Sequence, residues 1–272
     1  MSPRAQRLIA STAVALALAL TAAGCNTTNG PETTGSVGLS SMASAPSRSD
    51  AEWRTSLDTW GQRYRENPND PTAAIAYARA LRATEQYTQA VAVLEQAAMR
   101  NPKSMPLLGA YGRALADTGQ YTQALEALDK AHTPDNPDWR VLNAEGAVLD
   151  QMGRHAEAQR RYEAALKIVP GEPSILSNLG LSYALTKRLK QAEATLRQAA
   201  QNPNAGPKVR QNLALVVGLE GRFDEAERIA RADLPQAEAD ANAAYLRDML
   251  ARQKDWKKPG RTLSIPRPDA GT

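Results

Sequence analysis

Small side chains recur along this chain at intervals of 34 residues, between larger apolar residues at helical spacing. The first series is Ala78, Gly112, Gly146, Gly180 and Ala214. The second series, twelve residues further along, is Ala90, Ala124, Ala158, Ala192 and Ala226. No segment alternates apolar and polar residues at the period of two that strands require. Two helices approach closely only where side chains are nearly absent, so each unit is predicted to be a helical hairpin.

Five units follow one another without insertions. They span residues 71–104, 105–138, 139–172, 173–206 and 207–240. Residues 53–66 are predicted to form the second helix of an incomplete unit, which Pro68 closes. Residues 242–253 carry apolar side chains at helical spacing and are predicted to form a capping helix. Because each unit contacts its neighbours, one continuous all-α body is expected over residues 50–253.

The positions within each unit resemble the tetratricopeptide repeat. Position 11 holds Leu81, Leu115, Leu149, Tyr183 and Val217. Position 15, where the first helix ends, holds Gly119, Gly153 and Gly221 in three of the units. The resemblance implies a right-handed superhelical solenoid. It also implies that the first helix of each unit lines a concave groove, with positions 2, 5, 9, 12 and 13 facing inward.

Applied to this sequence, the resemblance implies a partner-binding groove that is polar at one end and apolar at the other. The candidate groove residues are Arg79, Arg82, Arg113, Asn143, Asn178, Leu181, Leu185, Asn212, Leu215 and Leu219, with Asp117, Asp150 and Gln151 among the further polar residues of the first three units. An extended or helical segment could bury its apolar side there while arginines pair with its carboxylates. Asn178 and Asn212 are candidates to hold the backbone of that segment. The alternative is that the capping helix covers the leucines and that the polar side chains are merely solvated.

The amino-terminal segment has the layout of a secretory signal. Arg4 and Arg7 precede an apolar run over residues 8–20, and small residues lead to Cys25. This segment resembles a bacterial lipobox, although Ala22 stands where Leu, Val or Ile is usual. The resemblance implies cleavage after residue 24 and lipidation of Cys25. Two alternatives remain: ordinary cleavage near Ala23 with a free Cys25, or an uncleaved amino-terminal anchor.

Cys25 is the only cysteine in the sequence, so no intramolecular disulfide can form. Acyl chains on Cys25 would anchor the protein stably in a membrane. Asn26 stands where an inner-membrane retention signal more often has Asp, so the resemblance favours the periplasmic face of the outer membrane. Residues 25–49 are predicted to form a lipidated, flexible linker because they contain little apolar mass. Residues 254–272 are predicted to form a basic disordered tail.

The sequence offers little support for catalysis, metal binding or nucleic-acid binding. His132 and His155 are the only histidines, and neither lies in a metal-ligand spacing. Phosphate-binding and nucleophile motifs are absent, so no catalytic residue, cofactor or small-molecule substrate is predicted. The formal net charge is +4. Removal of residues 1–24 would take away Arg4 and Arg7, leaving little overall charge to attract nucleic acid.

Beyond the generic repeat, residues 60–96 resemble the TadD family of tight-adherence (Flp) pilus assembly lipoproteins, notably in the segments 64–71 and 76–83. Residues 242–250 fit the same family. The resemblance implies an outer-membrane lipoprotein that helps the secretin or pilus machinery assemble or localise, acting by protein binding. The alternative is a periplasmic scaffold lipoprotein that recruits cell-wall enzymes. A hydrolase or other enzyme within the helical body is a third reading, which the lack of motifs disfavours.

Overall fold

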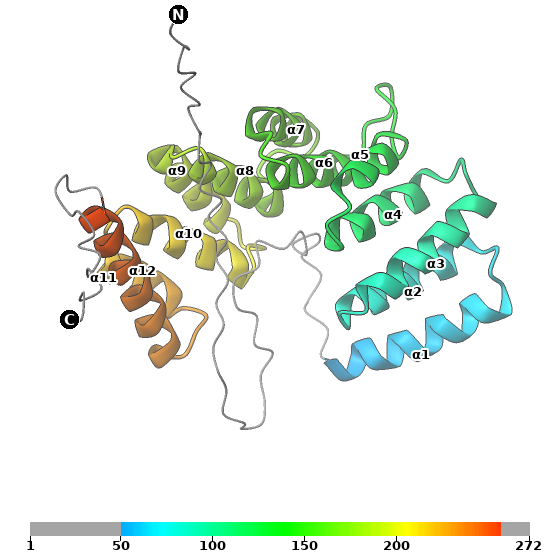
Figure 1. Cartoon of the computed structure of the whole chain (residues 1–272), viewed down its shortest axis with the longest axis horizontal. Coiled ribbons are helices and arrows are strands. Elements are labelled where there is room, and N and C mark those ends of the chain that lie inside the picture. The colour runs from blue at the N-terminus through cyan, green and yellow to red at the C-terminus, as the bar shows by residue number, and fades with distance from the viewer. Residues whose placement is uncertain (1–49, 257–272) are drawn as a thin grey trace, which may run out of the picture. The chain divides into compact units, whose positions relative to one another are not determined.

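The computed structural model describes residues 50–256, which form twelve α-helices (Figure 1). The first six are α1 (Asp50–Glu66), α2 (Pro71–Ala83), α3 (Tyr87–Arg100), α4 (Met105–Asp117), α5 (Tyr121–Asp129) and α6 (Trp139–Gln151). The others are α7 (His155–Ile168), α8 (Pro173–Leu185), α9 (Leu189–Ala200), α10 (Pro207–Leu219), α11 (Phe223–Ala230) and α12 (Gln236–Trp256). The predicted signal peptide, Cys25, the linker and nearly all of the basic tail lie outside the described residues. Among the helices that are described, none is both long enough and apolar enough to cross a membrane.

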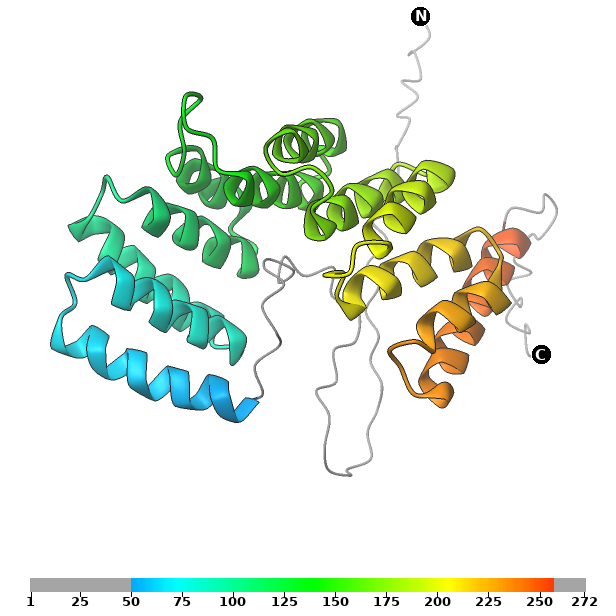
Figure 2. The same cartoon turned by 180° about the vertical axis from the view of Figure 1, so that it is seen from behind.

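The helices pack in the predicted hairpins, and each hairpin packs against the next. The first helices of successive units, α2, α4, α6, α8 and α10, contact one another in order along the array. The second helices, α3, α5, α7, α9 and α11, make no such contacts with one another within residues 50–256. Helices that lie closer together form the inner layer of a curved stack. The first helices therefore form the concave layer, and Figure 2 shows the same stack from behind.

The recurring small residues lie where the two helices of a hairpin touch. A Cβ on Gly146 would stand 2.5 Å from Cε1 of Tyr162, the large residue of the facing helix. The corresponding Cβ on Gly112 or Gly180 would stand 2.6 Å from Cγ of Leu128 or Leu196. Real Cβ atoms do not approach other heavy atoms so closely, because packed interiors leave no such overlap. The prediction that small residues permit close helix packing is confirmed.

The turn between the two helices of each unit adopts the left-handed backbone conformation at position 15. Gly119, Gly153 and Gly221 have φ values of 77°, 74° and 84° there, as their position predicted. Glu85 and Lys187 occupy the same position in the first and fourth units with φ values of 60° and 63°. The shared conformation shows that the repeat imposes this turn even on residues with a Cβ.

Three elements differ from the sequence-based expectation. Helix α1 begins at Asp50 and not at Trp53. The capping helix α12 begins at Gln236 and not at Asn242, because the carbonyl of Pro235 accepts hydrogen bonds from the amides of Glu238 and Ala239 and so starts the helix. Helix α5 has nine residues, whereas α3 and α7 have fourteen. A loop replaces its last turn, and His132 from that loop reaches the buried Glu145 on α6, 3.1 Å from Nε2 to Oε1.

Candidate functional site

The arginines predicted for the polar end of the groove lie on α2 and α4. Arg79 is exposed, whereas Arg82 and Arg113 are half-buried. The Nε atom of Arg82 donates a hydrogen bond to Asp117 on α4, which ties the first unit to the second. Arg79 and Arg113 form no hydrogen bond and no ion pair with any other described residue. Two of the three predicted arginines therefore remain available to a partner.

Arg113 carries its charge in an unfavourable setting. Burial, followed by the positive charge of Arg82, lowers its pKa from 12.5 to about 10, against the opposing effect of Asp138. Its Nη1 atom lies 3.5 Å from the point where a Cβ on Gly109 would stand, so the guanidinium lies back along α4 over a residue with no side chain. At neutral pH the side chain is still a cation, and no carboxylate among residues 51–252 forms an ion pair with it.

The three asparagines predicted for the groove are engaged between units. Asn143 is fully buried, so the expectation that it faces a partner is wrong. Its Oδ1 accepts a hydrogen bond from Nδ2 of Asn178 at 3.0 Å, and Nδ2 of Asn212 donates to Oγ of Ser177 at 2.9 Å. These bonds connect the first helices of neighbouring units. Because the amide N–H groups of Asn178 and Asn212 point to neighbouring helices, their predicted role in holding a peptide backbone is not supported.

The two aspartates predicted for the groove also form hydrogen bonds with other residues of the repeat array. Asp117 accepts the hydrogen bond from Nε of Arg82. Asp150 on α6 accepts a hydrogen bond from Ser182 Oγ on α8 at 2.8 Å and one from Tyr162 OH at 3.1 Å, and its Oδ1 lies 2.8 Å from His155 Nδ1. Burial raises the pKa of Asp150, whereas these hydrogen bonds oppose that shift. The carboxylates at the groove positions therefore hold the units together.

The leucines at the apolar end of the groove are at least partly accessible to solvent. Leu185 is 53% exposed, and Leu181, Leu215 and Leu219 are half-buried. None of these four leucines belongs to a buried core cluster of the described chain. The capping helix packs on the fifth unit through Leu246, whose Cδ1 lies 2.6 Å from the point where a Cβ on Gly218, at groove position 12, would stand. Leu185 is therefore not buried by α12, whereas Leu215 and Leu219 lie on α10, the helix that α12 contacts.

Each histidine contacts a carboxylate, but neither forms part of a metal site. His155 contacts Asp150, and His132 contacts Glu145, which also pairs with Arg161 at 3.1 Å. Among the side chains that the structure describes, residues 51–252, no group of three or more His, Cys, Asp and Glu is placed to hold a metal ion.

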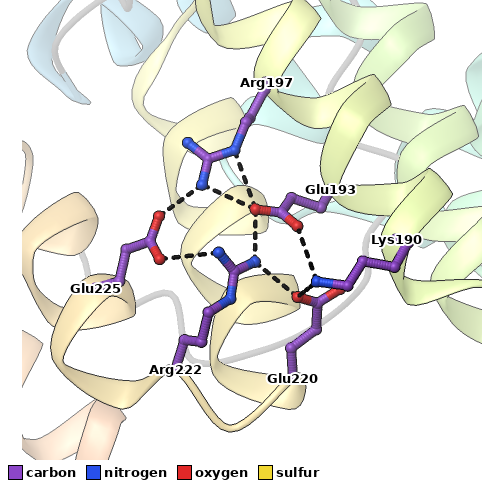
Figure 3. A network of polar contacts seen from close by, with 6 residues as sticks. All are labelled: Lys190, Glu193, Arg197, Glu220, Arg222 and Glu225. Atoms are coloured by element: carbon purple, nitrogen blue, oxygen red, sulfur yellow. Dashed lines mark hydrogen bonds and ion pairs between the residues drawn. The ribbon is translucent and has the colours of Figure 1, made fainter.

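A network of six charged side chains joins the fourth and fifth units, and the sequence analysis missed it (Figure 3). Its members are Lys190, Glu193, Arg197, Glu220, Arg222 and Glu225. An Nη2 atom of Arg222 lies 2.5 Å from Oε1 of Glu193, and Nη2 of Arg197 lies 2.5 Å from Oε1 of Glu225. The partners are separated by almost one repeat length, so only the stacking of units brings them together. No local pattern in the sequence signals such pairs.

Profiles of two known families match the chain. Residues 59–131 match the family described as anaphase-promoting complex, cyclosome, subunit 3, and residues 143–207 match the tetratricopeptide repeat. These matches coincide with hairpins that repeat every 34 residues and stack through their first helices. The chain is a tetratricopeptide-repeat protein. The sequence has no significant match among curated proteins.

Solved structures share the fold of this tetratricopeptide-repeat protein at low sequence identity. The crystal structure of the APC/C hetero-tetramer Cut9-Hcn1 has a TM-score of 0.62 and 15% identity, and the match covers 75% of this chain but only 40% of that chain. The crystal structure of PilW, described as a widely conserved type IV pilus biogenesis factor, has a TM-score of 0.61 and 16% identity, and the match covers 71% of this chain and 91% of that chain. A thermophilic TPR protein from Thermus thermophilus has a TM-score of 0.57, 23% identity and coverage of 67% and 100%. At these identities the likeness shows the fold alone.

The ion-pair network is expected to make this tetratricopeptide-repeat protein sensitive to acid. Hydrogen bonds from Arg222 and then Arg197 lower the pKa of Glu193 from 4.5 to about 2. Because the folded pKa lies below the unfolded value, the stabilisation is complete above about pH 4.5 and is lost as the pH falls towards 2. Allowing for solvent screening, Glu193→Gln should lower the free energy of unfolding at pH 7 by about 1–2 kcal/mol. Thermal unfolding between pH 7 and pH 3 measures both effects.

A matched control for this prediction is Glu163→Gln, which removes an exposed carboxylate of α7 that forms no ion pair with the other side chains of residues 51–252. Its melting curve should follow the wild type at every pH. Equal acid sensitivity of wild type and Glu193→Gln would show that the network does not stabilise the interface between the fourth and fifth units.

Proposed function

We propose that this tetratricopeptide-repeat protein is an outer-membrane lipoprotein whose concave groove binds a protein partner during assembly or localisation of the secretin and pilus machinery of a tight-adherence system. The observation that carries the proposal is the groove itself. It presents one exposed leucine, Leu185, three half-buried leucines and two arginines without a partner among the described residues. Exposed apolar surface of this kind marks interaction sites in soluble domains.

The assignment to the tight-adherence machinery rests on the resemblance of residues 60–96 and 242–250 to the TadD family. The structural likeness to a pilus biogenesis factor is compatible with it, although that likeness concerns the fold. In this proposal the groove supplies recognition and no chemistry.

The amino-terminal segments would determine where the groove works. Acyl chains on Cys25 would hold the protein at the periplasmic face of the outer membrane, since each buried CH₂ contributes about 0.8 kcal/mol. The linker over residues 25–49 would then set the reach of the repeat body. A flexible chain of that length has a typical end-to-end distance of about 27 Å. This distance would keep the groove clear of the lipid headgroups.

Replacement of Cys25 tests the membrane anchor. Cys25→Ser removes the thiol that would receive the lipid, so labelling with palmitate should be lost and the protein should leave the outer-membrane fraction. Wild type labelled in the same cells is the reference, and Ser41→Ala within the linker is the matched control. A Cys25→Ser protein that stays in the outer membrane, or an unlabelled wild type, would contradict the lipid assignment.

Site-specific crosslinking from the groove tests the partner. A photoreactive residue at position 185 should crosslink to the secretin or to another component of the pilus machinery in intact cells. The same residue at position 99, on the exposed side of α3, should not. Crosslinking of cell-wall enzymes from position 185 would instead favour the alternative, a scaffold lipoprotein.

A further inference from the structure

Some charged side chains of the groove already form hydrogen bonds or ion pairs within the fold, whereas others do not. Positions 2, 5, 9, 12 and 13 of the five first helices hold five cations and two carboxylates. The cations are Arg79, Arg82, Arg113, Arg140 and Lys208, and the carboxylates are Asp117 and Asp150. Both carboxylates bond to other units of the array. The surface that remains for a partner is therefore cationic.

Arg113 is the group for which a partner would matter most. It is half-buried between α4 and the start of α6, lies close to Arg82, and has no ion-pair partner in the described chain. A partly desolvated charge without a counter-charge destabilises the folded protein. A carboxylate supplied from outside would remove that penalty and would gain a charge-assisted, bidentate hydrogen bond from the guanidinium.

The apolar end of the groove lies two units further along. Successive first helices are in contact, and packed helices lie about 8–10 Å apart. The path from Arg113 on α4 to Leu181 on α8 is therefore about 20 Å, which about six extended residues span. A segment that reaches from Arg79 to Leu215 needs about ten to twelve residues.

We propose that the segment bound in the groove is an acidic–aliphatic peptide, whose carboxylates bind Arg79 and Arg113 and whose aliphatic side chains contact Leu181, Leu185 and Leu215. This inference rests on the proposed function and specifies the chemistry of the partner. A nucleic acid fits the groove less well. Sites for single-stranded nucleic acid combine cations with aromatic side chains on which bases stack, and no groove position of the five units holds an aromatic residue.

Peptide binding to the purified full chain in detergent tests the inference. Fluorescein-labelled twelve-residue peptides would carry three glutamates at one end and three leucines at the other, in both orders, and anisotropy would report binding. The wild type should bind one of the two orders, and the affinity should fall as salt is raised. Arg113→Met should weaken binding at least tenfold and leave the melting temperature unchanged or higher, because it removes an uncompensated charge.

Two further variants keep the result interpretable. Arg79→Gln changes an exposed side chain, so it should fold normally and should also weaken binding. Arg160→Met removes an exposed arginine of α7 in the outer layer and should bind as the wild type does. Unchanged affinity in both Arg113→Met and Arg79→Gln would overturn the inference.

Competing ligands separate this inference from others. A peptide with lysines in place of the glutamates should not bind, and equal binding would overturn the charge assignment. Oligoadenylate that binds more tightly than the acidic peptide would overturn it in favour of a general polyanion site. If no acidic peptide binds but position 185 still crosslinks to the secretin, the inference fails and the proposed function stands. If both experiments fail, the groove is not a protein-binding site.

Discussion

Replacing Leu181, Leu185 and Leu215 together by glutamine is expected to abolish capture of the secretin by the full chain, with a loss of affinity of at least about a hundredfold. Each leucine presents apolar surface that the fold leaves unburied, and a partner would bury it. A side chain that is already partly exposed contributes about 1 kcal/mol or less to folding. Helicity measured by circular dichroism should therefore match the wild type, whereas co-purification of the secretin after crosslinking should be lost.

The matched control for the triple variant removes exposed apolar side chains from the outer layer. Met99 on α3 is 71% exposed, and Ile168 on α7 is 39% exposed. The double variant Met99→Gln and Ile168→Gln should capture the secretin as the wild type does. Equal capture by the wild type, the control and the triple variant would refute the groove as the binding site.

Gly146→Ala is expected to lower the free energy of unfolding by about 1–3 kcal/mol, although alanine is the better helix former. The added Cβ would stand 2.5 Å from the ring of Tyr162, and that ring is held by the hydrogen bond from its hydroxyl to Asp150. Because the ring cannot turn aside, α6 and α7 must separate and lose contact along the whole hairpin. Thermal and urea unfolding would measure the change.

Gly109→Ala is the matched control and should have the opposite sign. Gly109 also lies inside a helix of the concave layer, but its nearest neighbours would be 3.5 Å from an added Cβ, which is ordinary van der Waals contact. The gain in helix propensity, about 0.5–1 kcal/mol, should then dominate. Destabilisation by Gly109→Ala equal to that by Gly146→Ala would show that the spacing of the hairpins does not depend on the small residue at position 8.

Much of the fold was predictable because the same pattern of small and apolar residues recurs in all five units. The small residues at positions 8 and 20 identified the helix contacts, and the glycines at position 15 identified the turns. The boundaries were less predictable where one unit departs from the others. Helix α12 starts early, directly after Pro235, and α5 ends early, before the loop that carries His132, and neither feature recurs at the same position of the other units.

The candidate site was predictable only in part. Arg79, Leu181 and Leu185 lie on first helices, which form the concave layer, and their role in partner binding remains a prediction. Position within the repeat could not show that Asn143 is buried beneath Asn178, because both occupy positions that face the groove in a single isolated unit. The angle and offset between neighbouring units decide which polar side chains meet.

By itself, the sequence determined that this protein is a row of helical hairpins with close contacts at fixed positions, since those contacts are local and are set by side-chain size. The tertiary structure alone decided which charges remain free. Asp117 and Asp150 are bound by residues of neighbouring units, whereas Arg113 is left without a partner in the described chain. Charge pairing across units depends on how the hairpins stack, and that stacking is a property of the whole array.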